Sequence, residues 1–192
     1  MLRTQRLTLR PLVRTDLAQF MALAGDYAVA SMTSDIPHPL NETRARAWLA
    51  PSRGETRFAI ELDGQMIGSA GFFRRKPNSA EIGFWIGRAF WGKGYVAEAG
   101  QAVIRYGFES DGLSRFSSSH FIDNPASGRV LAKLGFEACG RGRIWSAARE
   151  EEVIAVLLEL SRERAESRLG LPDPQPRQSR WGALIERVRG AQ

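Results

Sequence analysis

WGKGYVAEAG, residues 91–100, is the most informative stretch of this 192-residue chain. A strand-like alternation over 80–86 precedes it, and apolar residues recur at helical spacing after Gly94. Glycines in such a turn let backbone N–H groups converge, and the N-terminus of the following helix adds positive potential. The stretch has neither the GKS/T ending of a P-loop nor the third glycine of a dinucleotide fingerprint. It predicts a phosphate cradle of another kind, with a plain tight turn as the alternative.

Outward from this stretch, the pattern alternates between strands and short helices. The elements expected before it are a strand over 7–12, a helix over 15–24, a helix from Asn41 to Leu49, and strands over 58–62 and 66–73. Thr15 and Asn41 are typical N-caps. Asp63-Gly64 is the preferred pair for a type I′ hairpin turn.

The elements expected after the stretch are a strand over 115–122 and a short helix that begins at Asn124. Gly135 stands where the glycine that ends such a helix belongs. The apolar run 153–160 fits either a buried strand or a helix, and we leave this assignment open.

Composition indicates one globular domain with a basic appendage. Hydrophobic residues make up 43% and charged residues 25%, which excludes wholesale disorder. Cys139 is the single cysteine, and His38 and His120 are the only histidines, so we expect no disulfide and no metal site. No segment is apolar enough for a membrane span or a signal peptide, so we expect a cytoplasmic protein.

A set of motifs in a fixed order resembles one enzyme family. The residues downstream of the cradle are Asn124, Ser127, Val130, Lys133, Gly135 and Phe136, the string N-x-x-S-x-x-V-x-x-K-x-G-F. With RLTLRPL at 6–12, PHP at 37–39, Trp48-Leu49 and EIGFWI at 81–86, this string resembles the GNAT superfamily of acetyl-coenzyme A-dependent N-acetyltransferases. Within it, the chain is most similar to the ribosomal-protein N-terminal (Rim-type) branch.

The resemblance implies an α+β fold with three layers, α/β/α. Its mixed, mostly antiparallel sheet is splayed between the fourth and fifth strands, and acetyl-CoA lies in the splay. The residues that would contact the cofactor are Trp85 and Ile86 along the pantetheine arm, Gly92, Lys93, Gly94, Tyr95, Val96 and Ala97 at the pyrophosphate, and Asn124 and Ser127. Trp91 and Val96 depart from the family's usual residues in the loop.

Two residues are candidates for the chemistry that the resemblance implies. Glu81 is the candidate general base, acting through water, and an outward ion-paired residue is the alternative. A backbone N–H near Ile86 would meet the oxyanion. Many GNAT enzymes place a tyrosine acid seven residues after the motif asparagine, but Leu131 stands there. Ser127 stands where the Rim-type branch has its serine, so the resemblance makes it the candidate hydrogen-bond donor to the leaving sulfur; a helix serine bonded within its own turn is the alternative.

The resemblance implies that the acceptor is a primary amine, either a protein N-terminus or a small molecule. Pro37, His38 and His120 are expected on the substrate side, although a lone strand histidine is more often structural. Direct attack in a ternary complex would move the acetyl group. A catalytically silent acyl-CoA-binding regulator is an alternative, supported by the missing tyrosine.

The C-terminal segment differs in composition from the rest of the chain. We divide the chain into an acetyltransferase domain, 1–160, and a basic extension, 161–192, with seven arginines against four acidic residues. The extension has a proline-rich linker and an amphipathic stripe from Trp181 to Val188 that could dock a partner or form a homodimer. A ribosome- or RNA-associated function of this extension is a further alternative, whereas nucleic acid is not expected to bind the 1–160 domain.

Overall fold

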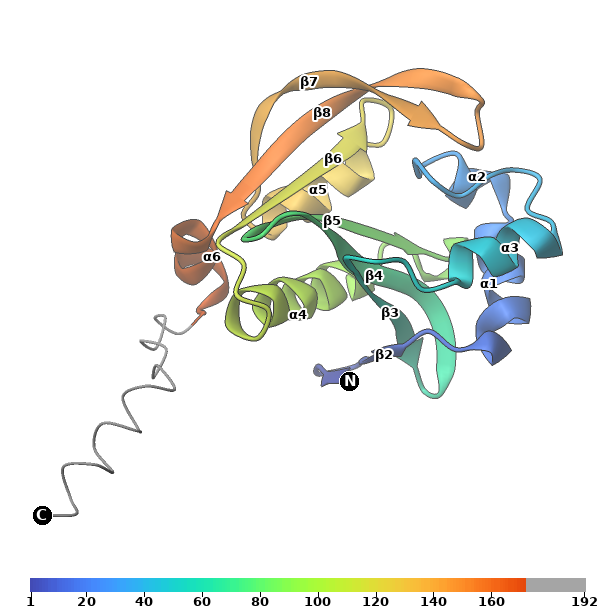
Figure 1. Cartoon of the computed structure of the whole chain (residues 1–192), viewed down its shortest axis with the longest axis horizontal. Coiled ribbons are helices and arrows are strands. Elements are labelled where there is room, and N and C mark those ends of the chain that lie inside the picture. The colour runs from blue at the N-terminus through green and yellow to red at the C-terminus, as the bar shows by residue number, and fades with distance from the viewer. Residues whose placement is uncertain (172–192) are drawn as a thin grey trace, which may run out of the picture.

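A computed structural model describes residues 1–171 of the chain (Figure 1). The strands are β1 (Leu2–Arg3), β2 (Thr8–Pro11), β3 (Glu55–Leu62), β4 (Gln65–Lys76), β5 (Ser79–Ile86), β6 (Arg115–Phe121), β7 (Glu137–Ser146) and β8 (Glu151–Ser161). The α-helices are α1 (Leu17–Ala24), α2 (Tyr27–Ala30), α3 (Glu42–Leu49), α4 (Tyr95–Glu109), α5 (Pro125–Lys133) and α6 (Arg162–Leu169). Short 3-10 helices cover Arg14–Asp16 and Arg88–Phe90.

The strands form one mixed sheet that opens in the middle. Their order is β1-β2-β3-β4-β5-β6-β8-β7, and every neighbouring pair is antiparallel except β5 and β6. These two strands pair only between Ser79–Glu81 and Arg115–Ser117. Beyond that point β6, β8 and β7 diverge from the half that holds β2 to β5 (Figure 1). The predicted mixed sheet is confirmed, and its fourth and fifth strands are β5 and β6 because β1 adds a short strand at the edge.

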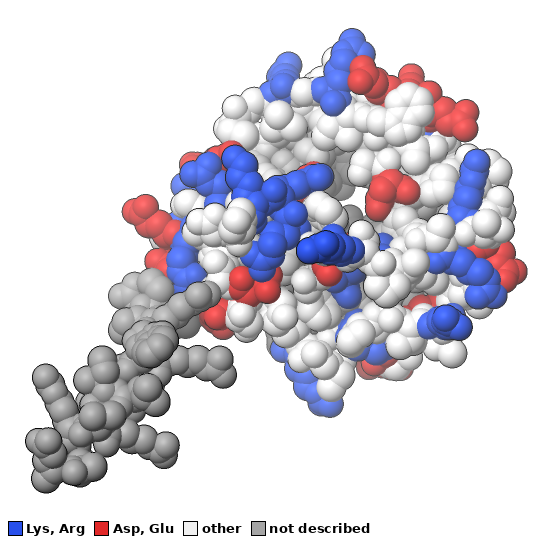
Figure 2. All heavy atoms as spheres, viewed as in Figure 1, with Lys and Arg blue, Asp and Glu red and all other residues white. Residues whose placement is uncertain are grey.

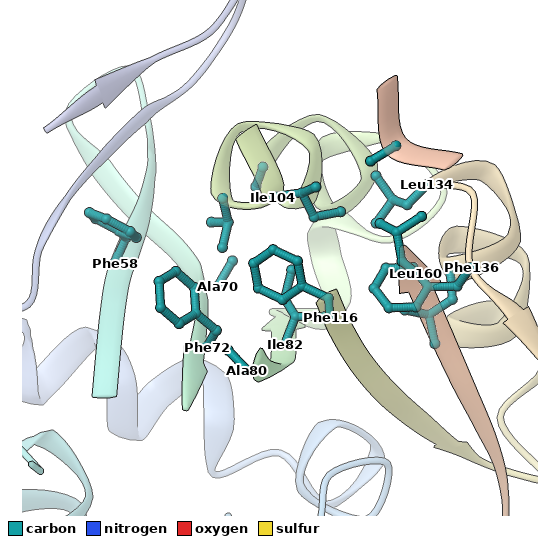
Figure 3. Packing of buried hydrophobic residues seen from close by; sticks show 14 of the residues in the cluster. Phe58, Ala70, Phe72, Ala80, Ile82, Ile104, Phe116, Leu134, Phe136 and Leu160 are labelled. Atoms are coloured by element: carbon teal, nitrogen blue, oxygen red, sulfur yellow. The ribbon is translucent and has the colours of Figure 1, made fainter. Parts of the chain in front are cut away.

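Two apolar cores lie on opposite faces of the sheet, which gives the three predicted layers. In β3, Phe58 and Ile60 belong to the larger core, while Ala59 between them belongs to the smaller one. The larger core packs the sheet against α4 and α5 and contains the residues in Figure 3. The smaller core packs it against α1, α2 and α3. Alternation along β3 thus assigns each side chain to a face.

Helix α4 lies very close to the sheet near its C-terminal end. A β-carbon added at Gly107 would stand 2.4 Å from Cζ of Phe116 on β6, so only glycine fits there. Val103, one turn earlier, is fully buried in the larger core. Helix α4 is therefore seated directly on the sheet over this part of its length.

Local signals before residue 76 predicted the structure well, with one error. The hairpin of β3 and β4 turns at Asp63 and Gly64, whose φ values of 50° and 80° suit a type I′ turn. Asn41 caps α3 as expected. The expected cap at Thr15 is wrong, because Thr15 lies inside the 3-10 helix and α1 begins only at Leu17.

Asp16 explains the late start of α1. Its carboxylate accepts a hydrogen bond from the Val13 amide at 2.8 Å and forms an ion pair with Arg10 at 2.8 Å. These contacts hold residues 14–16 in a tight turn that precedes the helix.

The C-terminal part of the described chain resolves the open assignment at 153–160. This run is strand β8, paired with β6 on one side and with β7 on the other. Helix α6 continues from it, and Ala165 and Leu171 are buried in the larger core. The packed body therefore continues past residue 160 to at least Leu171. The amphipathic stripe Trp181–Val188 lies outside the described residues.

Within residues 1–171, no helix is long and apolar enough to cross a membrane.

Candidate active site

A cavity of about 330 Å³ lies where β5 and β6 separate. Its walls come from β5 over 81–85, from β6 over 118–121, from the loop 32–35, from β3 and β4, and from Ser127 on α5. Figure 2 shows this face hollowed, with both acidic and basic side chains at the rim of the hollow. Glu81, Trp85, His120 and Ser127, which the sequence singled out separately, line this one cavity.

The backbone of β5 has hydrogen-bonding groups directed into the gap. The hydroxyl of Ser118 donates to the Ile82 carbonyl at 3.0 Å, just beyond the last paired residues. The Gly87 amide donates to Ile67 of β4 at 2.9 Å. Because amides alternate in direction along a strand, those of Phe84 and Ile86 point the other way, into the gap. An extended ligand can therefore pair with this edge of β5.

Trp91 restricts that pairing at its far end. Its indole Nε1 donates to the Ile86 carbonyl at 2.9 Å. This carbonyl is therefore already engaged, while the Ile86 amide is directed into the gap. The departure from the family at Trp91 thus has a structural consequence: the predicted strand-like bonds at Ile86 are limited to its N–H.

The glycine-rich loop has the geometry of an anion cradle. Gly92 and Gly94 adopt φ values of 75° and 82°, which L side chains rarely take. Gly94 is the N-cap of α4 and offers no side chain to the amides of the first turn. These amides have no intrahelical partner, so they are available to a phosphate group. The loop is exposed, and a β-carbon at Gly92 would meet nothing within 4 Å.

Arg6 ties this loop to the N-terminal strands, which sequence reasoning missed. Its Nε pairs with Glu98 Oε2 at 2.7 Å, and its Nη1 donates to the Lys93 carbonyl at 3.1 Å. Its guanidinium also lies over the Tyr95 ring, 4.6 Å from the centroid. The cradle is therefore held from outside by a side chain distant in sequence.

Helix α5 presents one free hydroxyl to the cavity. Asn124 caps the helix, and its Oδ1 accepts from the Ser127 amide at 3.1 Å. The Ser127 hydroxyl makes no hydrogen bond within residues 1–171, so the local bond considered from sequence is not formed there. Leu131, one turn further, is fully buried in the larger core.

Glu81 lies in the cavity as an ion-paired carboxylate. Its Oε2 accepts from Arg75 Nε at 2.8 Å and Nη2 at 2.5 Å, and 36% of its side chain is exposed. The two roles considered from sequence for Glu81, a general base and an ion-paired residue, are therefore compatible, because Oε1 is left for a water molecule or an amine.

Trp85 forms part of an aromatic wall. It is only 7% exposed and packs edge-on against Phe20 and Trp48, with centroids 5.6 and 6.2 Å away. Its indole Nε1 is buried and makes no hydrogen bond within the described chain.

The cavity also contains charged residues that the sequence did not reveal. Arg57 lies over the Trp48 ring at 3.9 Å, and its Nη2 is 3.3 Å from Glu55. Burial raises the pKa of Glu55 and lowers the pKa of Arg57. Asp35 accepts from the Trp48 indole at 2.8 Å. The sequence did contain one indication of their position. Side chains alternate between the two faces of a strand, so Glu55 and Arg57 lie on the face opposite to that of the core residue Phe58.

The loop expected on the substrate side contributes different residues from those predicted. Residues 32–35 line the cavity, whereas Pro37 and His38 do not. The His38 ring packs edge-on against Tyr27, with centroids 5.1 Å apart. His120 does line the cavity.

Comparison with known proteins defines the class to which this fold and cavity belong. The family model "Acetyltransferase (GNAT) domain" matches residues 6–137. The chain is 34% identical over 149 residues to the uncharacterized N-acetyltransferase YoaA of Bacillus subtilis, covering 72% of this chain and 84% of that protein. It is 36% identical over 86 residues to a ribosomal-protein-serine acetyltransferase of Escherichia coli, covering 43% of this chain and 48% of that protein.

A solved structure has the same fold. RimJ of Mycobacterium smegmatis, in complex with CoA-disulfide, matches with a TM-score of 0.72 and 21% identity, covering 85% of this chain and 88% of that one. Taken together, the comparisons identify an acyltransferase fold. The chain belongs to the GNAT N-acetyltransferase family.

Proposed function

We propose that the chain transfers the acetyl group of acetyl-CoA to a primary amine by direct attack in a ternary complex. The observation that carries this proposal is the convergence of Glu81 and Ser127 on one cavity at the splayed edge of β5. The cradle at Gly92 and Gly94 lies at the other end of that edge and suits the pyrophosphate of CoA. Acetyl-CoA supplies the activated thioester, and the remaining chemistry belongs to the side chains.

The proposal gives specific roles to residues of the cavity and of the cradle. Phe84 and Ile86 hold the pantetheine arm through their amides, and the Ile86 N–H also faces the developing oxyanion. Glu81 takes the proton of the attacking amine through Oε1 or through water. The Ser127 hydroxyl donates a hydrogen bond to the sulfur. Lys93 and the amides of residues 95–97 complete the pyrophosphate site.

A protein N-terminus is the acceptor we favour, and a small amine is the second. An α-amine of pKa near 7.8 is roughly 14% neutral at pH 7, whereas a lysine-like amine near 10.4 is roughly 0.04% neutral. Because Arg75 engages one oxygen of Glu81, an acceptor that needs little help from a base fits this site better. The similarity to a ribosomal-protein-serine acetyltransferase supports the same choice.

A thiol-release assay with acetyl-CoA and an amine panel tests the proposal. The panel contains peptides with free N-termini, polyamines and amino sugars. Glu81→Gln and Ser127→Ala are each expected to lower kcat by roughly 10²-fold for the best acceptor, within the range for proton-transfer groups. Glu159→Gln is the matched control, because Glu159 pairs with Arg115 on the surface at 3.1 Å and does not line the cavity.

The alternatives predict different results. A silent acyl-CoA-binding regulator would bind CoA and release no thiol with any amine. An RNA-associated protein would show a salt-sensitive gel shift that disappears when residues 172–192 are deleted. Full activity of both cavity variants would contradict the assigned roles.

A further inference from the structure

His120 has one ring nitrogen fixed and the other free inside the cavity. Its Nδ1 lies 2.8 Å from the Phe121 carbonyl oxygen. A carbonyl oxygen only accepts hydrogen bonds, so Nδ1 carries the proton of this bond. Nε2 is therefore the nitrogen that gains or loses a proton, and it makes no hydrogen bond within residues 1–171.

Helix α5 leaves space for this ring next to Ser127. A β-carbon added at Gly128 would stand 2.8 Å from Nε2 and 3.0 Å from Cε1 of His120. The ring thus lies against the bare Cα of Gly128, and any side chain there would displace it. Both His120 and Ser127 line the cavity, and the residue of α5 that the ring touches, Gly128, directly follows Ser127.

We propose that His120 gives the leaving thiolate its proton; this inference rests on the proposed function. An ordinary imidazolium is more acidic than a thiol of pKa near 8.5, whereas a serine hydroxyl is far less acidic. Ser127 can therefore orient the sulfur but cannot protonate it efficiently. Leu131 is buried and offers no acid, and His120 is the titratable side chain that β6 contributes to the cavity.

The step balances as follows. The neutral amine nitrogen forms a bond to the acetyl carbonyl carbon, and the C–S bond breaks with its electron pair on sulfur. Nε2–H of the imidazolium transfers its proton to that sulfur, while the surplus amine proton goes to Glu81 or to water. The products are the amide and the free thiol of CoA. Neutral His120 keeps its Nδ1–H bond to Phe121 and recovers a proton from water in the cavity.

The charged groups around His120 are mixed in sign. Asp123 and Arg149 form an ion pair at 2.6 Å at the end of β6. Glu81 lines the same cavity from β5. Arg141 of β7 lies in the same row as His120, on the far side of β8. The residue of α5 that touches the ring, Gly128, carries no charge.

The first test needs no acceptor amine. The ultraviolet absorbance of the CoA thiolate is titrated with pH in the binary complex of the full chain with CoA. Because an adjacent imidazolium favours the thiolate, bound CoA is expected to ionise at a pH roughly 1–3 lower than in His120→Gln. Calorimetric affinity for CoA is expected to be similar in the two proteins, since Gln retains a polar group of comparable size.

The second test measures turnover with the best amine of the panel. His120→Gln is expected to lower kcat by roughly 10²-fold or more and to flatten the alkaline limb of its pH profile, because a general acid must be protonated to act. Gly128→Ala keeps the histidine but displaces its ring, so it is expected to lower kcat as well. Gly140→Ala is the matched control, because a β-carbon there meets nothing within 4 Å.

The outcomes separate the two proposals. If the wild-type chain binds no CoA, the proposed function and this inference both fail. If it binds CoA and turns over, but His120→Gln leaves the thiolate titration and the pH profile of kcat unchanged, only the role of His120 is overturned. The role of His120 is supported if bound CoA ionises at a lower pH in the wild type than in His120→Gln, and if His120→Gln and Gly128→Ala both lose kcat.

Discussion

Replacing Leu131 by tyrosine tests whether α5 can supply an acid as many GNAT enzymes do. Leu131 has no exposed surface and packs with Leu134 and Phe136 in the larger core. A phenol ring overfills this position, at a cost of about 1–3 kcal/mol. Its hydroxyl is buried without a partner there, which costs about 1–3 kcal/mol more. We therefore expect Leu131→Tyr to lower the free energy of unfolding by roughly 2–6 kcal/mol, or Tm by roughly 4–24 °C.

Leu131→Phe is the matched control for this prediction. It fills the position almost equally but lacks the hydroxyl. Urea unfolding followed by circular dichroism should therefore find the tyrosine variant less stable than the phenylalanine variant by about 1–3 kcal/mol. Thiol release by the two variants should be equal, because neither aromatic ring reaches the cavity.

The opposite pattern would refute the reasoning. If the tyrosine variant were at least as stable as the phenylalanine variant and also turned over faster, its hydroxyl would have found a partner at the sulfur. Residue 131 would then face the cavity when CoA is bound, and the burial of Leu131 would not describe the working enzyme.

Two further predictions concern acid stability and the cradle. Burial raises the pKa of Asp16, but hydrogen bonds from Arg10 and the Val13 amide outweigh it and lower the pKa overall. Because the pKa of Asp16 is lower in the folded state, its stabilisation of the fold is present above the unfolded-state pKa near 3.9 and is lost as pH falls through the folded-state pKa. Urea titrations should show Asp16→Asn less stable than the wild type by about 1–3 kcal/mol at pH 7. This difference in stability should be smaller below pH 4. Gly94→Ala should weaken CoA binding by roughly 5–30-fold. The reason is that binding must impose the φ of +82° on an exposed loop, at a cost of about 1–2 kcal/mol. Gly64→Ala, with φ +80° in the turn between β3 and β4, is the control and should leave the calorimetric affinity for CoA unchanged.

Local chemistry made most of the fold predictable from sequence. Asp63-Gly64, Asn41 and Asn124 each specify backbone geometry through their own side chains or φ preferences, and each acts where predicted. The strand β7 was not predicted, because its sequence lacks such local signals. It contains Gly140 and Gly142 and is exposed along most of its length, so it has neither strand propensity nor an apolar alternation.

The cavity was predictable only in part, because its walls come from distant segments. Glu81 and Ser127 could be named from motifs, and His120 as a lone histidine on an expected strand. Arg57 and Asp35 could not, because alternation along β3 indicates only the face on which Arg57 lies, while its place in one cavity with Asp35 depends on tertiary packing. Sequence likewise gave no sign that Arg6 would hold the cradle, because its partner Glu98 is 92 positions away in the sequence.

The orientation of α5 about its axis links the replacement of the usual GNAT tyrosine by Leu131 to the chemistry of the cavity. A helix has 3.6 residues per turn, so Ser127 and Leu131 lie on adjacent turns of one face. The face tilts inward along its length: Ser127 lines the cavity, and Leu131 is already in the core. An acid on the deeper turn would have to leave the core to reach the sulfur. The wall opposite that turn is β6, and the titratable side chain that β6 contributes to the cavity is His120. The same packing that removes an acid from α5 thus makes room, at Gly128, for one from the sheet.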